Sequence, residues 1–246
     1  MKNLEEKVAL VTGASRGIGA AIAQKLAAEG AKVIVNYAGS QNEAEAVVKA
    51  IESNGGSAIA IRADISIAQD VEHLFDASIS HFGRIHILVN NAGIMITKPI
   101  KDTTDEDFDR QFNINVKGTF LTLREAATKL AENGAIINFS TSVNRVIVPT
   151  YGTYVATKSA VEQLTRVFAK EIGARGITVN SVSPGPVNTE LFIKGKPQQA
   201  IDGAKASSPF NRLGEPEDIA NVVAFLAGSE AKWISGQNIG VNGAMS

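Results

Sequence analysis

The sequence predicts a single α/β domain, a doubly wound sheet of seven parallel strands with helices on both faces. Short apolar runs alternate with helical patterns, a glycine-rich turn follows the first apolar run, and no linker or charge block divides the 246 residues. The alternation also suits an eight-fold barrel. Seven predicted strands and the glycine-rich first turn favour the open sheet instead.

The predicted strands are apolar runs of the length expected for strands buried on both faces of a parallel sheet. They cover residues 7–12, 32–36, 58–62, 85–90, 135–140, 177–183 and 237–241. The predicted helices cover residues 20–29, 42–53, 68–82, 105–131, 155–172 and 216–227. Regularity breaks between 184 and 215. Because the part from 190 to 212 follows the sixth strand, we expect it to cover the site as a lid.

The composition is that of a globular protein with a sizeable core, with 44% hydrophobic and 20% charged residues. The 24 basic and 25 acidic residues give a net charge of -1, which offers no broad electrostatic footprint for nucleic acid or an anionic membrane. Cysteine is absent, which excludes disulfides and thiol nucleophiles. Since the sequence shows neither a signal-peptide pattern nor a membrane-spanning apolar run, we expect a cytoplasmic protein.

The turn after the first strand has the pattern G-x-x-x-G-x-G, formed by Gly13, Gly17 and Gly19. Glycines there let the backbone approach a pyrophosphate that rests on the N-terminus of the next helix, so the turn predicts a dinucleotide site. The second strand ends at Asn36, not at the acid that usually holds the ribose 2′-hydroxyl of NAD. Because Arg16 can reach a 2′-phosphate, NADP is favoured over NAD.

Tyr154 and Lys158 lie one helical turn apart, so their side chains point to the same side of a helix. An ammonium beside a phenol favours the phenolate and lowers the pKa of the phenol, which suits a general acid or base. The same spacing also arises by chance, with the tyrosine at the core edge and the lysine in solvent. The three histidines (His73, His81 and His86) lie away from this pair, and their spacing predicts no metal site.

Several motifs follow one another along the chain. They are Thr12-Gly13-x-x-x-Gly17-x-Gly19, Asn90-Asn91-Ala92-Gly93, Asn115, a hydroxyl cluster after the fifth strand, Tyr154-x-x-x-Lys158 and Pro184-Gly185. In this order they resemble the short-chain dehydrogenases/reductases, and among them the 3-oxoacyl-carrier-protein reductase-like group. The resemblance implies a Rossmann-like sheet, a nicotinamide cofactor and a homotetramer.

The resemblance also implies roles for single residues. Tyr154 would be the acid/base, Lys158 would lower its pKa and bind the nicotinamide ribose, and Asn115 would hold a water in a proton relay. Ser142 would polarise the substrate carbonyl if the alignment follows the next turn, whereas Thr141 takes that place when counted from the strand; Ser142 is preferred. The implied cofactor residues are Gly13, Ser15, Arg16, Gly17, Ile18, Gly19, Asn36, Tyr37, Ala38, Asp64, Ile65, Asn91, Ala92, Gly93, Tyr154, Lys158, Pro184, Gly185, Val187 and Thr189.

Some assignments stay open at this point. Asp64 would accept from the adenine amino group, cap a helix, or do both. Arg145 replaces a frequent glycine and is expected near the pocket mouth, and Val241-Asn242-Gly243-Ala244 lacks the family's frequent acid and second glycine. The lid lysines, Lys194 and Lys196, would meet an acidic carrier protein or keep the loop soluble. Five apolar positions would pack between subunits or belong to the core: Phe120, Leu121, Leu164, Val167 and Phe168.

The sequence therefore predicts an NADPH-dependent carbonyl reductase that reduces a ketone, an aldehyde or a 3-oxoacyl substrate. Apolar residues of the lid suggest a hydrophobic or mixed substrate. Two alternatives remain: a sugar or secondary-alcohol dehydrogenase that uses NAD(P), and a non-catalytic NADP-binding sensor.

Overall fold

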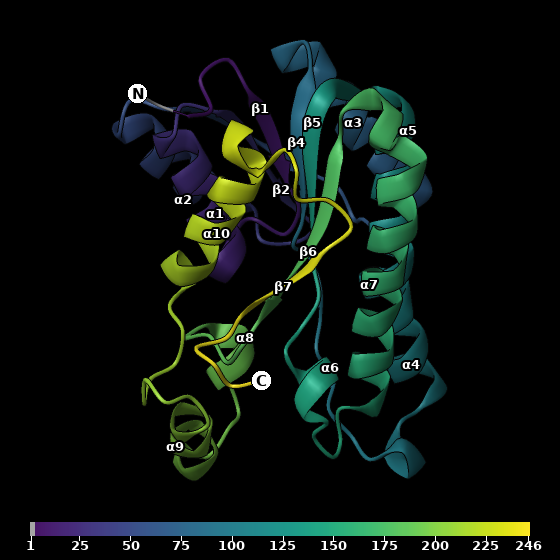
Figure 1. Ribbon diagram of the computed structural model, residues 1–246, viewed down its shortest axis with the longest axis vertical. Helices are drawn as coiled ribbons and strands as arrows, with labels where there is room; N and C mark the ends of the chain where they lie inside the picture. The colour runs from purple at the N-terminus through teal and green to yellow at the C-terminus, as the bar shows by residue number, and fades with distance from the viewer. Residues whose placement is uncertain (1–2) are drawn as a thin grey trace.

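The computed structural model describes residues 3–246, which form one sheet of seven parallel strands. The strand order is β3-β2-β1-β4-β5-β6-β7, with β1 and β4 adjacent inside the sheet (Figure 1). The strands are β1 Val8–Val11, β2 Lys32–Tyr37, β3 Ser57–Arg62, β4 Ile85–Asn90, β5 Leu130–Phe139, β6 Thr178–Pro184 and β7 Asn238–Val241. The predicted fold class is confirmed. The domain predicted over residues 1–246 includes Met1 and Lys2, which lie outside the described residues.

Helices cover both faces of the sheet (Figure 1). One face carries α1 Gly17–Ala28, α2 Gln41–Ser53 and α10 Pro216–Ala227, and the other carries α3 Ala68–Phe82, α4 Asp105–Phe112, α5 Gly118–Lys129 and α7 Gly152–Ile172. The shorter segments are η1 Ile100–Asp102, η2 Asn113–Lys117, α6 Val143–Val146, η3 Gly173–Arg175, α8 Glu190–Ile193, α9 Gln198–Ala206 and η4 Ser229–Ala231. Among residues 3–246, no helix combines the length and the apolar character needed to cross a membrane.

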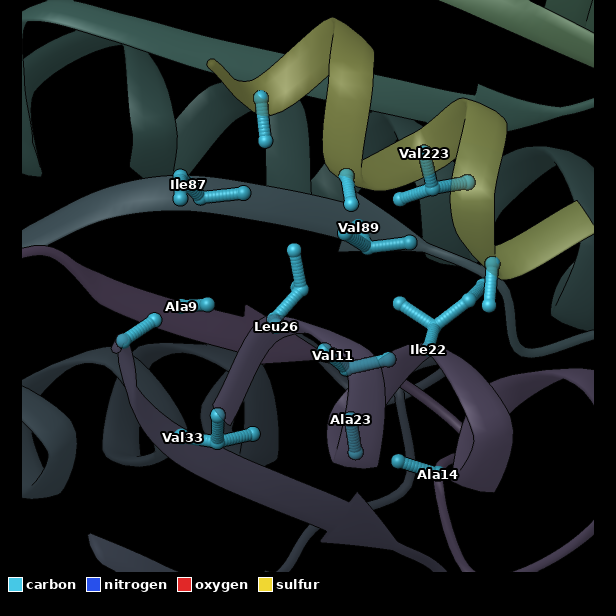
Figure 2. Packing of buried hydrophobic residues seen from close by; sticks show 14 of the residues in the cluster. Ala9, Val11, Ala14, Ile22, Ala23, Leu26, Val33, Ile87, Val89 and Val223 are labelled. Atoms are coloured by element: carbon cyan, nitrogen blue, oxygen red, sulfur yellow. The ribbon is translucent and has the colours of Figure 1, made fainter. Parts of the chain in front are cut away.

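Alternate strand residues supply two hydrophobic cores. Ala9 and Val11 of β1 belong to the core under α1 and α10, where Figure 2 shows Ile22 and Leu26 of α1 packed beside the strand. Leu10 belongs to the second core, under α3, α5 and α7. Six of the seven predicted strands begin and end within one residue of the observed ones. A strand buried on both faces, such as β1, has an unbroken apolar sequence that marks its position.

The predicted helix over residues 105–131 is wrong as a single element. It is divided into α4 and α5 by the π-helical turn η2, and the chain enters β5 at Leu130, five residues before the predicted start. The side chain of Asn115 in η2 leaves the helix and bonds to the backbone of Ile94, donating to its carbonyl and accepting from its N–H, both at 2.9 Å. This partner is distant in sequence, so the helical pattern alone could not reveal the interruption. Turns of this kind frequently occur at functional sites.

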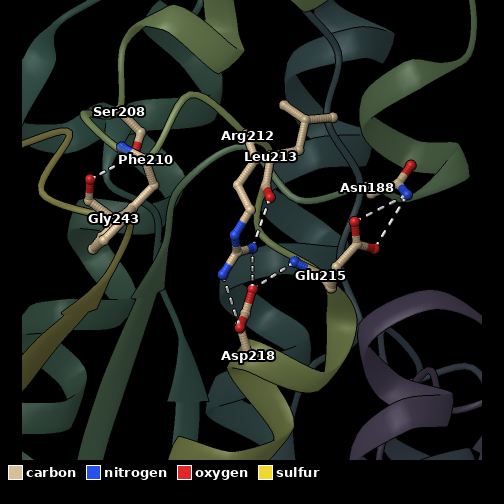
Figure 3. Close-up of polar contacts among 8 residues, drawn as sticks. All are labelled: Asn188, Ser208, Phe210, Arg212, Leu213, Glu215, Asp218 and Gly243. Atoms are coloured by element: carbon tan, nitrogen blue, oxygen red, sulfur yellow. Dashed lines mark hydrogen bonds and ion pairs between the residues drawn. The ribbon is translucent and has the colours of Figure 1, made fainter.

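The predicted lid contains two short helices, α8 and α9, and its two ends are fixed together at its base. Val187 pairs with Gly214 in an isolated parallel bridge, and the backbone N–H of Asn188 donates to Gly214 at 2.8 Å. Figure 3 shows the side-chain contacts at this base, where Asn188 donates to Glu215. The segment between these ends lies beyond the carboxyl ends of the strands, where Figure 1 shows α8 and α9. The base is therefore anchored, while the lid extends past the sheet.

The five apolar positions expected between subunits or in the core fall into two groups. Leu121 is a core residue, and Leu164 and Phe168 pack against the edge of the core. Phe120 and Val167 are 47% and 56% exposed. Only these last two are free to contact another molecule.

Candidate active site

A long groove crosses the carboxyl ends of the strands, and it collects almost all of the predicted cofactor residues. One part begins at the glycine-rich turn and passes the end of β2, and it meets a second, more apolar pocket around Tyr154. The two parts share six lining residues: Ile18, Asn91, Gly93, Ile94, Thr189 and Leu191. Of the predicted cofactor residues, Tyr37 alone lies outside the lining of both parts.

The glycine-rich turn leaves the N-terminus of α1 open to the groove. Within the described part of the chain no side chain caps this helix, and its first turn contains no acidic residue. A Cβ on Gly19 would lie 2.4 Å from the carbonyl oxygen of Gly13, so a larger residue would displace the turn. Uncapped N–H groups and the positive end of the helix dipole form an anion site. The groove therefore fits the pyrophosphate of a dinucleotide.

Asn36 at the end of β2 and Asp64 after β3 both form hydrogen bonds within the protein. Asn36 is buried, its side-chain oxygen accepts from Gly13 N–H at 3.3 Å, and its amide donates to the carbonyls of Ile61 and Ala63. Asn36 thus holds the glycine-rich turn and the end of β3 in place. Asp64 accepts from both the N–H and the hydroxyl of Ser66, as a local cap would, while still lining the groove.

Arg16 lies at the open side of the groove with its side chain 63% exposed. Its guanidinium is 3.4 Å from the carboxylate of Glu190, the first residue of α8. Lys194 contacts the same carboxylate at 2.9 Å and also lines the groove. These two cations hold the pKa of Glu190 below its usual value, the lysine contributing most. A phosphate bound here would compete with Glu190 for both cations.

Tyr154, Lys158 and Asn115 converge behind Gly93. A Cβ on Gly93 would lie 3.2 Å from the side-chain oxygen of Asn115 and 3.4 Å from Nζ of Lys158. Lys158 donates to the carbonyl of Phe139 at 2.9 Å, and its Nζ is 5.9 Å from the centre of the Tyr154 ring. Asn115 also donates to Thr157 Oγ1 at 3.1 Å, which joins the π turn to α7. The predicted triad is thus assembled from two segments, α7 and η2.

The electrostatics differ from the sequence prediction, which had Lys158 lowering the pKa of Tyr154. Burial raises the pKa of Tyr154 to about 12, against an opposing hydrogen bond with Thr141. Burial also lowers the pKa of Lys158 to about 8. In this structure the loss of hydration is the largest cause of both shifts. At neutral pH the phenol therefore carries its proton.

The two candidate hydroxyls for the carbonyl lie in different surroundings. Ser142 Oγ is buried, donates to the carbonyl of Ser183 at 3.0 Å and accepts from the amide of Asn242 at 3.0 Å. Thr141 lines the pocket beside Tyr154, and its side chain lowers the pKa of that phenol against the larger effect of burial. The geometry therefore does not favour Ser142, because its proton is already used by the backbone.

Sequence reasoning missed several residues that line the apolar pocket, among them Met95, Tyr151 and Met245. Tyr151 is three residues before Tyr154, and the two rings meet edge to face with centres 6.3 Å apart, so helical spacing could have identified it. Met95 and Met245 carry no sequence signal for this position. Arg145 is exposed and does not line the pocket; its Nη1 lies near Gly240 of β7.

The groove and its residues can be compared with known proteins. A family model described as enoyl-(acyl carrier protein) reductase matches residues 13–246. A short-chain type dehydrogenase/reductase of Picea abies is 44% identical in an alignment of length 247 that covers 96% of this chain and 91% of the relative. Versicolorin reductase of Emericella nidulans is also 44% identical, over 98% of this chain and 96% of the relative.

The solved structures that resemble this chain include short-chain dehydrogenases/reductases as well. A short-chain dehydrogenase/reductase from Serratia marcescens has a TM-score of 0.95 and 40% identity, with 99% of each chain covered. A short-chain dehydrogenase from Burkholderia cenocepacia, solved in complex with NADP, has a TM-score of 0.93 and 38% identity, with the same coverage. The likeness thus extends over the whole sheet and both of its helical layers.

Proposed function

Because the chain belongs to the short-chain dehydrogenase/reductase family, we propose that it is an NADPH-dependent carbonyl reductase acting on a ketone, an aldehyde or a 3-oxoacyl compound. One observation carries the proposal. Tyr154 and Thr141 line the same apolar pocket, where the threonine side chain lowers the pKa of the phenol, and this pocket opens into the dinucleotide groove. A carbonyl oxygen bound between these two hydroxyls would place its carbon toward the groove.

NADP is supported by the charges around the groove and by the relatives. The end of β2 offers no carboxylate to repel a 2′-phosphate, while Arg16 and Lys194 offer two cations. The Burkholderia structure contains NADP, and an angucycline ketoreductase at 40% identity was solved with bound NADP. When bound, NADPH supplies the hydride for the carbonyl carbon. The glycine-rich turn would hold its pyrophosphate, and the wall from Asn91 to Gly93 would hold its nicotinamide end.

Residues of the chain would donate the proton, bind the carbonyl oxygen and stabilise the phenolate that forms. Tyr154 donates its phenolic proton to the carbonyl oxygen, and its raised pKa keeps that proton in place at neutral pH until the oxygen becomes basic. Thr141, in place of Ser142, donates a hydrogen bond to the same oxygen. Lys158 stabilises the phenolate that remains, because a cation in a desolvated site acts strongly on nearby negative charge. Asn115 orders the π turn beside Lys158.

The reductive direction is supported by the named relatives, which include a versicolorin reductase, an elsinochrome reductase and an NADPH-dependent aldehyde reductase-like protein. The apolar lining of the pocket, with Tyr151, Leu191 and Phe192, suits a hydrophobic carbonyl compound. A homotetramer that covers Phe120 and Val167, and a cytoplasmic location, stay predictions.

The test follows NADPH absorbance with a panel of ketones, aldehydes and a 3-oxoacyl thioester. We expect turnover of at least one class, loss of at least about 100-fold in kcat for Tyr154→Phe, and a similar loss for Thr141→Val. Ser142→Ala is the matched comparison, and we expect it to retain more activity than Thr141→Val. Failure to oxidise NADPH with every class, or a Tyr154→Phe variant as active as the wild type, would overturn the proposal.

A further inference from the structure

The segment that follows β7 returns toward the active site through a tight turn. Gly243 and Ala244 both have a φ of 60°, and the N–H of Met245 donates to the carbonyl of Asn242 at 3.3 Å. Positive φ at both central residues is the pattern of a type I′ turn. Residue 244 is an alanine where glycine adopts this φ more easily, so tertiary contacts must hold the turn in place.

Three hydrogen bonds supply those contacts, two of them to distant segments of the chain. The amide of Asn242 donates to Ser142 Oγ at 3.0 Å, beside Thr141 at the end of β5, and also to Ser246 Oγ at 2.8 Å. The hydroxyl of Ser208, after α9 of the lid, donates to the carbonyl of Gly243 at 2.6 Å, as Figure 3 shows. The turn is thus attached at one side to Ser142, which follows β5, and at the other side to Ser208 of the lid.

The lid contact leaves no room for a side chain on the turn. A Cβ on Gly243 would lie 2.6 Å from Ser208 Oγ and 3.2 Å from the ring of Phe210. Glycine is therefore required at this position both by its positive φ and by the close approach of the lid. Replacing it would displace the turn without altering any residue that lines the pocket.

The turn brings Met245 into the lining of the pocket that also contains Thr141, Tyr151 and Tyr154. The methionine side chain is half-buried, long and unbranched, with three rotatable bonds. Such a side chain fills the space next to a substrate and adapts to its shape. Neither the hydrogen bonds of the sheet nor the proposed chemistry requires a methionine at this position.

We propose that Met245 is a specificity-determining residue that limits the size of the carbonyl compound, held in place by the turn at Asn242–Met245 and its contact with the lid. The proposal rests on the proposed function, since it names the wall of the same pocket. In this arrangement Ser142 does not bind the substrate carbonyl. It is a positioning residue that fixes the turn by accepting a hydrogen bond from Asn242.

The first experiment compares two methyl ketones that share the reacting group, acetophenone and the larger 2-acetylnaphthalene, with NADPH. We expect Met245→Ala to raise the ratio of kcat/KM for the larger over the smaller ketone by about tenfold, because a few methylene groups in an apolar pocket change discrimination by that order. Met245→Leu, of similar volume, should keep the ratio of the wild type. Gly243→Ala should relax selectivity in the same direction, because it displaces Met245 while leaving its side chain intact.

The second experiment does not need turnover. The chain has three methionines, so methyl-¹³C labelling gives a spectrum of three signals, of which Met245→Leu identifies one. We expect the Met245 signal of NADPH-loaded protein carrying Tyr154→Phe to shift when acetophenone is added. An unchanged signal together with an unchanged selectivity ratio in Met245→Ala overturns the inference while leaving the reductase activity standing. A shifted signal in a protein that reduces no carbonyl compound supports the pocket wall and overturns the proposed function.

Discussion

Replacing the buried lysine should change how the stability of this protein depends on pH. Burial lowers the pKa of Lys158 from 10.5 to about 8 in the folded protein. Between these two values the unfolded chain binds a proton at this site that the folded chain has released. Stability therefore rises with pH across this window, since the unfolded state binds more protons.

The magnitude follows from the size of the shift. A difference of one pKa unit corresponds to about 1.4 kcal/mol, so the whole window from pH 8 to 10.5 is worth about 3 kcal/mol. Tyr154 acts in the opposite direction, because its raised pKa removes stability only as the pH rises above the unfolded value of 10. Measurements that stop at pH 10 therefore isolate the lysine, with an expected gain of about 2 kcal/mol between pH 7.5 and 10.

The assay is urea unfolding of the wild type and of Lys158→Met at pH 7.5, 8.5, 9.25 and 10. Methionine fills similar space without a charge. The variant also leaves the carbonyl of Phe139 without its lysine donor, at a cost of about 1–3 kcal/mol, but this cost is the same at every pH. The wild type should gain about 2 kcal/mol on the variant from pH 7.5 to 10. A difference that stays flat would show that the ammonium is not desolvated in the folded protein, and the argument from burial would be refuted.

Three further predictions concern the groove and the sheet. Glu190→Gln should tighten NADPH binding about two- to fivefold in a fluorescence titration at low salt, because Arg16 loses a competing carboxylate; equal or weaker binding would contradict it. Gly19→Ala should weaken NADPH binding at least about tenfold by calorimetry, because its Cβ would meet a carbonyl oxygen at 2.4 Å, and an unchanged Kd would refute this. His86 has a lowered pKa, mainly from burial, and accepts a hydrogen bond from Val8 N–H. The free energy of unfolding of the wild type should therefore fall more steeply than that of His86→Gln as the pH drops below 6.5. Parallel plots of unfolding free energy against pH for the two proteins would count against this prediction.

The elements and the order of the motifs could be predicted from local sequence. A strand such as Ile85–Asn90 is buried on both faces, so its apolar run marks its limits, and α3 and α10 were predicted with their observed ends. The glycine pattern from Gly13 to Gly19 indicated the dinucleotide groove, because the turn depends on backbone freedom that glycine alone provides.

The remaining features depend on partners that are distant in the chain. Asn115, in the turn that interrupts its helix, bonds to Ile94, and our preference for Thr141 over Ser142 rests on the bond that Ser142 donates to the carbonyl of Ser183. The largest cause of the raised pKa of Tyr154 is burial, which its spacing to a lysine in the sequence could not indicate.

The sequence by itself determined the fold class, the cofactor groove and the Tyr154–Lys158 pair, since these follow from periodicity and from residue types at fixed spacing. Only the tertiary structure decided that Thr141 lines the pocket beside the phenol, that Lys158 is buried, and that Met245 lines the same pocket. The physical reason is that hydration and hydrogen-bond partners are set by neighbours across the fold, and no local pattern encodes them.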